Sequence, residues 1–340
     1  MKDRFSTIAV FAIALLAAAA GASEAIEWPR LGRPAVTAPK GLLEVGAREE
    51  GALSLEREGR LIPLNANWFK APGAIHRGRA AIPEAIAPGR YGLQLVSPGG
   101  TSIRKGAVHI LADTPEEYDI AVVRGALPAE GAAGESPLPG DLPARLAEAQ
   151  VAAALIIGPL TPRGAGEDYQ ALEALLAGIE APVYLCPHQS DLRGGAFRAQ
   201  FGSPIYGAPF GRDGFLFLGA GLPAEDPRAA EFLGEAHLLR RALRAARWSI
   251  GVAAEFGLGW DLHAQMALFV DDPLNALIAG SVAPGLGATV PWGGTAFVLP
   301  AEGPREAITV VSVTPTGIRL RKEAATEQTP PAPQDEAPVE

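Results

Sequence analysis

Short apolar runs that suit buried strands alternate with amphipathic helical patterns along residues 118–321, and this order constrains the fold most. The first three apolar runs cover residues 118–123, 151–157 and 182–186. Between and after them, apolar residues recur at helical spacing over residues 142–150, 168–176, 231–247 and 261–269. Such alternation of strand and helix predicts a layered α/β fold for this part of the chain.

Residues 26–114 are patterned differently, because glycine and proline interrupt them at short intervals. Between these breaks lie brief alternating runs, such as Leu53–Glu56 and Tyr91–Val96. Frequent turn signals between short strands predict a β-sandwich. The segment Pro88–Leu93, Pro-Gly-Arg-Tyr-Gly-Leu, resembles a strand entry that is common in immunoglobulin-like accessory domains, and any other antiparallel β-domain would fit the same pattern.

The two ends of the chain differ from both parts. Lys2 and Arg4 precede an apolar run over residues 8–20, and small residues follow it. This is the pattern of a secretory signal peptide over residues 1–25, with cleavage after residue 22 or 25, although an uncleaved anchor remains an alternative. We therefore expect a periplasmic or secreted protein. Residues 323–340 are rich in proline and glutamate, which predicts a disordered tail.

Composition limits the partners of the protein. Apolar residues make up 48% of the chain and charged residues 20%, as in a packed globular protein. The net charge of −9 argues against nucleic acid and against an anionic membrane surface, since both select basic patches. Cys186 is the single cysteine, so no intrachain disulfide can form.

The polar loop after the run at residues 182–186 is the first candidate site, because ligands of α/β proteins usually bind beyond the carboxyl ends of strands. The segment Pro182–Asp191 resembles the strand and Gly-Asn-His-Asp loop of calcineurin-like metallophosphoesterases. Pro187 and Asp191 fit that loop pattern. The resemblance implies a four-layer α/β (α+β) phosphoesterase sandwich preceded by an all-β sandwich, with two metal ions held on five loops.

Most metal ligands of that family are replaced in this chain. Gly158 is kept, but Pro159 stands in place of the bridging aspartate. Glu255 lies just beyond the position where a histidine is expected, and Ser281 replaces one of two later histidines. Because such centres need carboxylate and imidazole ligands at these points, we expect no metal centre of this type.

These observations favour a secreted, non-catalytic binding or scaffolding protein that holds an unknown protein or small ligand at the strand-end face. One alternative is an active phosphoesterase with a rebuilt site and divalent metal ions, using His188 and Asp191, with Glu255 or Asp168. Another alternative is a structural envelope protein. The candidate binding residues are Gly158, His188, Gln189, Ser190, Asp191, Glu255, Ser281 and Trp292, of which Trp292 would fill the old pocket or line a groove.

Overall fold

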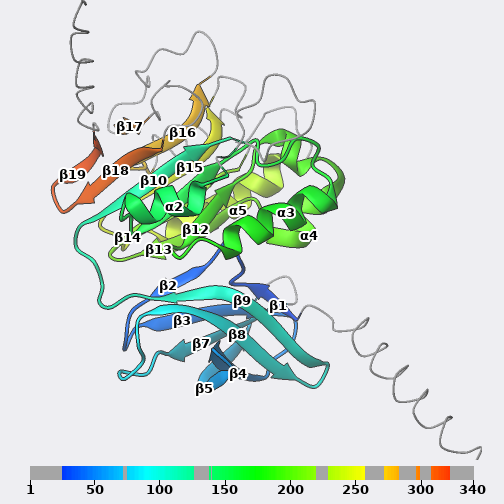
Figure 1. Ribbon diagram of the computed structural model, residues 1–340. Coiled ribbons are helices and arrows are strands. Elements are labelled where there is room, and N and C mark those ends of the chain that lie inside the picture. Colours follow the sequence, from blue (N-terminus) through cyan, green and yellow to red (C-terminus); the bar gives the residue numbers. More distant parts are fainter. Residues whose placement is uncertain are drawn as a thin grey trace, which may run out of the picture.

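The computed structural model describes residues 25–71, 75–125, 138, 140–219, 229–256, 272–282, 296–298 and 308–321. Figure 1 shows two stacked units, one built from β1–β9 and the other from the remaining strands and all labelled helices. Residues 1–24 of the predicted signal peptide (1–25), the predicted tail, the helix expected at 261–269 and Trp292 lie outside the described residues. No described helix is long and apolar enough to cross a membrane.

The first unit consists of two sheets that face each other across an apolar core. One sheet has the order β1(Ile26–Trp28), β3(Leu42–Ala47), β7(His76–Ala81), β6(Ala66–Lys70). The other has the order β2(Ala35–Thr37), β9(Gly100–Ile110), β8(Gly89–Ser97), β4(Ala52–Arg57), β5(Arg60–Leu64). Alternate residues such as Val45, Leu55 and Leu93 are fully buried between the sheets, as the period of a strand requires.

The second unit contains two five-stranded sheets. The first has the order β12(Val183–Cys186), β11(Ala153–Ile157), β10(Tyr118–Arg124), β18(Thr309–Thr314), β19(Gly317–Arg321). The second has the order β13(Tyr206–Phe210), β14(Asp213–Phe217), β15(Ser249–Phe256), β16(Ala276–Val282), β17(Ala296–Val298). Within them β10–β12 and β14–β17 run parallel, whereas the hairpins β13–β14 and β18–β19 are antiparallel.

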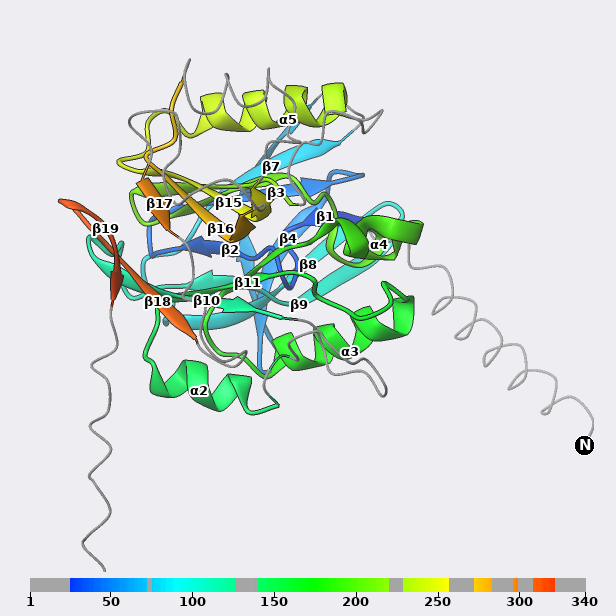
Figure 2. The same ribbon diagram turned by 90° about the horizontal axis from the view of Figure 1, so that it is seen from above.

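Apolar side chains join these sheets to each other and to the helices. Leu155 and Tyr184 of the first sheet meet Phe217 and Ile250 of the second in one cluster. The helices are α2(Leu142–Glu148), α3(Gly166–Ala177), α4(Ala196–Phe201) and α5(Ala229–Ala242), with a 3₁₀ segment, η1(Gln189–Gly195). Figure 2 shows α2 and α3 on one side of the unit and α5 on the other.

The predicted fold class, a four-layer phosphoesterase sandwich, is wrong. Strands make up 47% and helices 18% of the structure, and the strands form four sheets. Two sheets come from the nine strands before residue 111, and two hairpins extend the others without any helical crossover. The helices expected at 142–150, 168–176 and 231–247 correspond to α2, α3 and α5, so the error lies in the four-layer arrangement that the resemblance implied, which a local apolar pattern does not encode.

Candidate functional site at the strand ends

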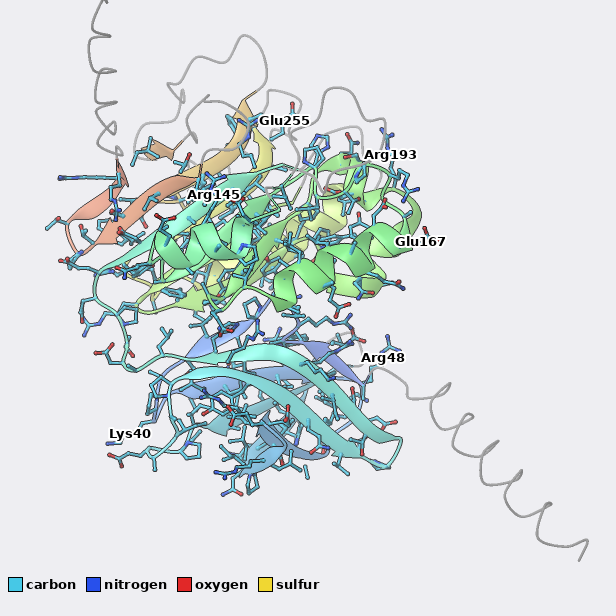
Figure 3. The ribbon with its side chains drawn as sticks, viewed as in Figure 1. Lys40, Arg48, Arg145, Glu167, Arg193 and Glu255 are labelled. Atoms are coloured by element: carbon cyan, nitrogen blue, oxygen red, sulfur yellow. The ribbon has the colours of Figure 1, made fainter. Side chains whose placement is uncertain are left out.

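The carboxyl ends of parallel strands from both sheets of the second unit meet at one edge. The Cys186 thiol lies 3.5 Å from the Val252 carbonyl oxygen of β15, which shows that β12 and β15 face each other there. Figure 3 places Glu255 of β15 and Arg193 of η1 along this edge, on the side of the second unit away from the first. The edge is therefore built by both sheets.

His188 caps the 3₁₀ segment η1 that follows β12. Its Nδ1 accepts a hydrogen bond from the backbone N–H of Ser190 at 3.3 Å and lies 3.0 Å from the Ser190 hydroxyl. The first N–H groups of such a segment have no partner within it, so a side chain at the cap position satisfies one of them. This contact fixes the orientation of the imidazole.

Asp191 is fully buried and completes a capping box with His188. Its carboxylate accepts the backbone N–H groups of Leu160 and Thr161 at 3.0 and 3.1 Å, and that of His188 at 2.8 Å. Burial raises the pKa of the Asp191 carboxyl group, and these hydrogen bonds oppose the rise. Asp191 thus ties the loop after β11 to the loop after β12, and its oxygens are occupied by backbone donors.

Gly158 makes this connection possible because no side chain fits at its position. A Cβ atom there would lie 2.6 Å from Oδ2 of Asp191 and 2.7 Å from the backbone nitrogen of His188. Gly280 on β16 is similar, since its Cβ would lie 2.6 Å from the carbonyl oxygen of Ala254. Both glycines therefore allow close backbone approach, and neither is placed to bind a ligand through a side chain.

His188 also faces Glu255, which connects the two sheets at the rim. Its Nε2 lies 3.6 Å from Oε2 of Glu255, and the side chains are 31% and 43% exposed. Glu255 is in register with Ser281 on β16, whose hydroxyl lies 3.5 Å from the Ala254 carbonyl oxygen. The structure thus brings His188, Ser190 and Glu255 together at the surface, with Ser281 on the next strand.

The remaining predicted residues lie differently. Asp168 pairs with Arg163 at 2.5 Å, and this hydrogen bond lowers the pKa of the Asp168 carboxyl group. Gln189 is exposed at the start of η1. No cluster of three or more histidine, cysteine, aspartate or glutamate side chains suited to a metal ion occurs among the described residues.

Sequence reasoning missed the structural role of Asp191 and its partners at Leu160 and Thr161. A signal was present, because His188 is followed three residues later by Asp191, the spacing of a capping box. The pairing of Arg163 with Asp168 was also missed, although their separation by five residues at a helix start makes contact feasible.

Comparisons with known proteins identify no family. No family model and no curated protein matches the sequence. The structural similarities are weak. They include the Bacteroides ovatus mixed-linkage glucan utilization locus protein SGBP-B, solved with a mixed-linkage heptasaccharide (13% identity, 28% of this chain and 24% of that one, TM-score 0.19). The N-terminal eight immunoglobulin domains of Down Syndrome Cell Adhesion Molecule follow (10% identity, 29% and 14%, TM-score 0.19).

A third similar structure is a carbohydrate acetylesterase from Xanthomonas citri, with 15% identity over 76% of this chain and 68% of that one, and a TM-score of 0.25. The chain spans under a quarter of the length of the first two structures. The resemblance to calcineurin-like metallophosphoesterases stays a prediction from motifs.

Proposed function

We propose that the protein is a non-catalytic binding protein whose strand-end face holds a small polar ligand. The observation that carries this proposal is the partly exposed pair of His188 and Glu255, which joins the two sheets at the rim. Its backbone frame is set by Asp191, which holds the adjoining loops together. A polar pair on a fixed frame is preorganised for binding, because little side-chain freedom is lost when a ligand arrives.

The chemistry of the rim favours a neutral ligand that is rich in hydroxyl groups. Glu255 accepts hydrogen bonds, the imidazole of His188 donates or accepts them, and Ser190 and Ser281 add hydroxyl groups that do both. The carboxylate of Glu255 disfavours an anion bound beside it. Oligosaccharides present the matching pattern of closely spaced donors and acceptors.

A second candidate function is ester hydrolysis with Ser190 as nucleophile, and one specific observation favours it. Ser190 Oγ lies 3.0 Å from His188 Nδ1, while His188 Nε2 faces Glu255, so the three groups have the order of nucleophile, base and orienting acid. The backbone N–H groups of Leu160 and Thr161, which lie in the neighbouring loop, donate to Asp191 and are therefore not free to stabilise an oxyanion. We place binding first for this reason.

A glycan array that presents neutral and acidic oligosaccharides tests the binding proposal. We expect saturable binding to neutral glycans that falls at least about tenfold in His188→Ala and Glu255→Gln, since each change removes a hydrogen-bonding group from a small site. His237→Ala and Glu167→Gln are matched controls, because both residues are exposed elsewhere on the second unit. These controls should bind as the unchanged protein does.

Three other measurements separate the alternatives. Labelling of Ser190 by a fluorophosphonate, together with hydrolysis of p-nitrophenyl acetate that is lost in Ser190→Ala, would show that the function is ester hydrolysis and not binding. Two tightly bound manganese, iron or zinc ions per chain, with phosphoester turnover that depends on His188, would indicate a rebuilt phosphoesterase. Array binding that is equal in His188→Ala and the unchanged protein would place the ligand elsewhere and contradict the proposal.

We also propose export of the protein, with cleavage of the signal peptide between Ala22 and Ser23 rather than after Ala25. The carbonyl oxygen of Ala25 accepts the backbone N–H of Arg48 at 2.8 Å, and Ala25 is only 6% exposed. Cleavage after Ala25 would remove this acceptor from the start of β1. The intact mass of protein purified from a secreting bacterium should therefore correspond to a chain that begins at Ser23, and a mass that begins at Ile26 would contradict this.

A further inference from the structure

A cavity of about 250 Å³ lies between the two units, away from the strand-end face. The first unit contributes residues before β2 and on β9, and the second contributes residues of α3 and α4. The lining residues are Arg30, Leu31, Ile103, Arg104, Lys105, Glu173, Gln200 and Phe201. Pockets for drug-sized ligands have volumes of about 300–1,000 Å³, so this cavity suits a smaller molecule.

Several hydrogen bonds between the units hold the walls of this cavity in place. The Arg30 side chain is 5% exposed and donates to the carbonyl oxygens of Ala199 and Gln200 in α4 at 3.0 and 3.2 Å. Arg90 donates to the carbonyl oxygen of Ile179, just beyond α3, at 2.7 Å. The backbone N–H of Leu185 in β12 donates to a backbone carbonyl oxygen of the first unit at 2.8 Å. The cavity is therefore formed before any ligand enters it.

The charge of the lining is opposite to that of the whole chain. Three cationic side chains, those of Arg30, Arg104 and Lys105, line the cavity together with one carboxylate, that of Glu173, in a chain whose net charge is −9. Arg30 is paired with the carboxylate of Glu27 at 3.2 Å, and Arg104 donates to the carbonyl oxygen of Ile26 at 2.9 Å. The Glu173 carboxylate already accepts a hydrogen bond from Gln200. Lys105 is exposed and forms no ion pair with any other described residue. A concave site that holds a cation without a carboxylate partner attracts anions, and in the part of the chain that the structure describes Lys105 is such a cation.

The rest of the lining is apolar. Phe201 is 3% exposed, and Leu31 is partly buried against the same core cluster. Ile103 lies on β9 with 49% of its surface exposed. A ligand that covered Ile103 and approached Phe201 would remove this apolar surface from water.

We propose that this cavity binds a small organic anion with a short hydrocarbon part. Its head group, a carboxylate or a phosphate monoester, lies against Lys105 and Arg104, and its apolar part lies against Ile103 and Phe201. Arg30 lies in the buried wall, where it is paired with the carboxylate of Glu27 at 3.2 Å and donates to backbone oxygens, so Lys105 and Arg104 supply the attraction for the head group. Such a ligand contacts both units at once, so its binding also strengthens their association. The proposal is independent of the ligand at the strand ends.

Calorimetric titration of the full chain with octanoate, octyl phosphate and octanol, each below its micelle-forming concentration, tests this assignment. We expect one anion site per chain and at least about tenfold weaker binding of octanol, because the uncharged alcohol loses the attraction of the cations. Lys105→Glu should weaken anion binding by about tenfold or more, and Ile103→Ser should weaken it severalfold. Lys70→Glu, at an exposed position of β6, is the matched charge control.

The outcomes are distinct. Binding of octanoate alone, or of octyl phosphate alone, supports the site and identifies its head group. Octanol that binds as tightly as the anions, binding that is equal in Lys105→Glu and Lys70→Glu, or no binding of either anion would overturn the proposal. Urea unfolding of each variant shows that weaker binding does not come from a loss of folded protein.

Discussion

Replacement of Asp191 by alanine is expected to lower the free energy of unfolding by about 3–5 kcal/mol, although Asp191 was predicted as a catalytic candidate. Its buried carboxylate accepts the backbone N–H groups of Leu160, Thr161 and His188. Each buried donor left without an acceptor costs about 1–3 kcal/mol, and water that enters the small space offsets part of this cost. Urea denaturation, followed by tryptophan fluorescence, measures the change.

Two further variants make this expectation specific. Asp191→Asn keeps the shape but offers one acceptor oxygen and presents an NH₂ group to backbone donors, so a smaller loss of about 1–3 kcal/mol is expected. Glu167→Ala, at an exposed position in the first turn of α3, is the control and should change stability by less than about 0.5 kcal/mol. An Asp191→Ala protein as stable as Glu167→Ala would rule out the structural role.

The sequence was most informative where strands are buried on both faces. The runs at residues 118–123 and 182–186 correspond to β10 and β12 within one residue at each end. Continuous apolar runs of β-branched and aromatic residues are typical of strands that are covered on both faces of a sheet. The helical period over 168–176 likewise predicts most of α3.

The edge strand β13 was missed for a physical reason. Its sequence, Tyr-Gly-Ala-Pro-Phe, contains both a glycine and Pro209, which argue against a strand in the interior of a sheet. β13 lies at the end of its sheet and pairs only with β14, so one side of its backbone needs no partner within the sheet. Sequence patterns do not show which strands lie at an edge.

The candidate site was predictable in part. The position of the loop at a strand's carboxyl end follows from the strand pattern, and the structure places His188 and Ser190 there. The contact between His188 and Glu255 depends on how two sheets pack, which no local spacing encodes. The sequence also did not show the roles of the loop residues. Asp191 and His188 are both polar, yet Asp191 is fully buried and His188 is partly exposed.

His109 is expected to make folding stability depend on pH through the seam between the units. It is 6% exposed on β9, and burial, with a smaller contribution from the facing Arg90, lowers its pKa to about 3. Arg90 is the single other titratable residue among those that line the narrow space around His109. The same imidazole in the unfolded chain has a pKa of about 6.5.

The direction of the effect follows from proton binding. Between pH 6.5 and 3 the unfolded chain binds a proton at His109 that the folded protein does not, so folding stability falls as the pH falls through this window. Each pH unit well inside this window lowers the free energy of unfolding by about 1.4 kcal/mol, which gives a loss of about 2 kcal/mol between pH 7 and pH 5. Urea unfolding at several pH values measures it.

His109→Gln should remove this share of the pH dependence, because glutamine has a similar size and does not titrate in this range. His237→Gln is the matched control, since His237 is exposed on α5 and should leave the pH dependence as it is. Equal pH dependence in the unchanged protein and His109→Gln would show that His109 gains a proton without loss of the fold. A flatter dependence of stability on pH in His109→Gln alone would place the acid-sensitive group between the two units, where burial and, to a smaller extent, Arg90 disfavour a positive charge on His109.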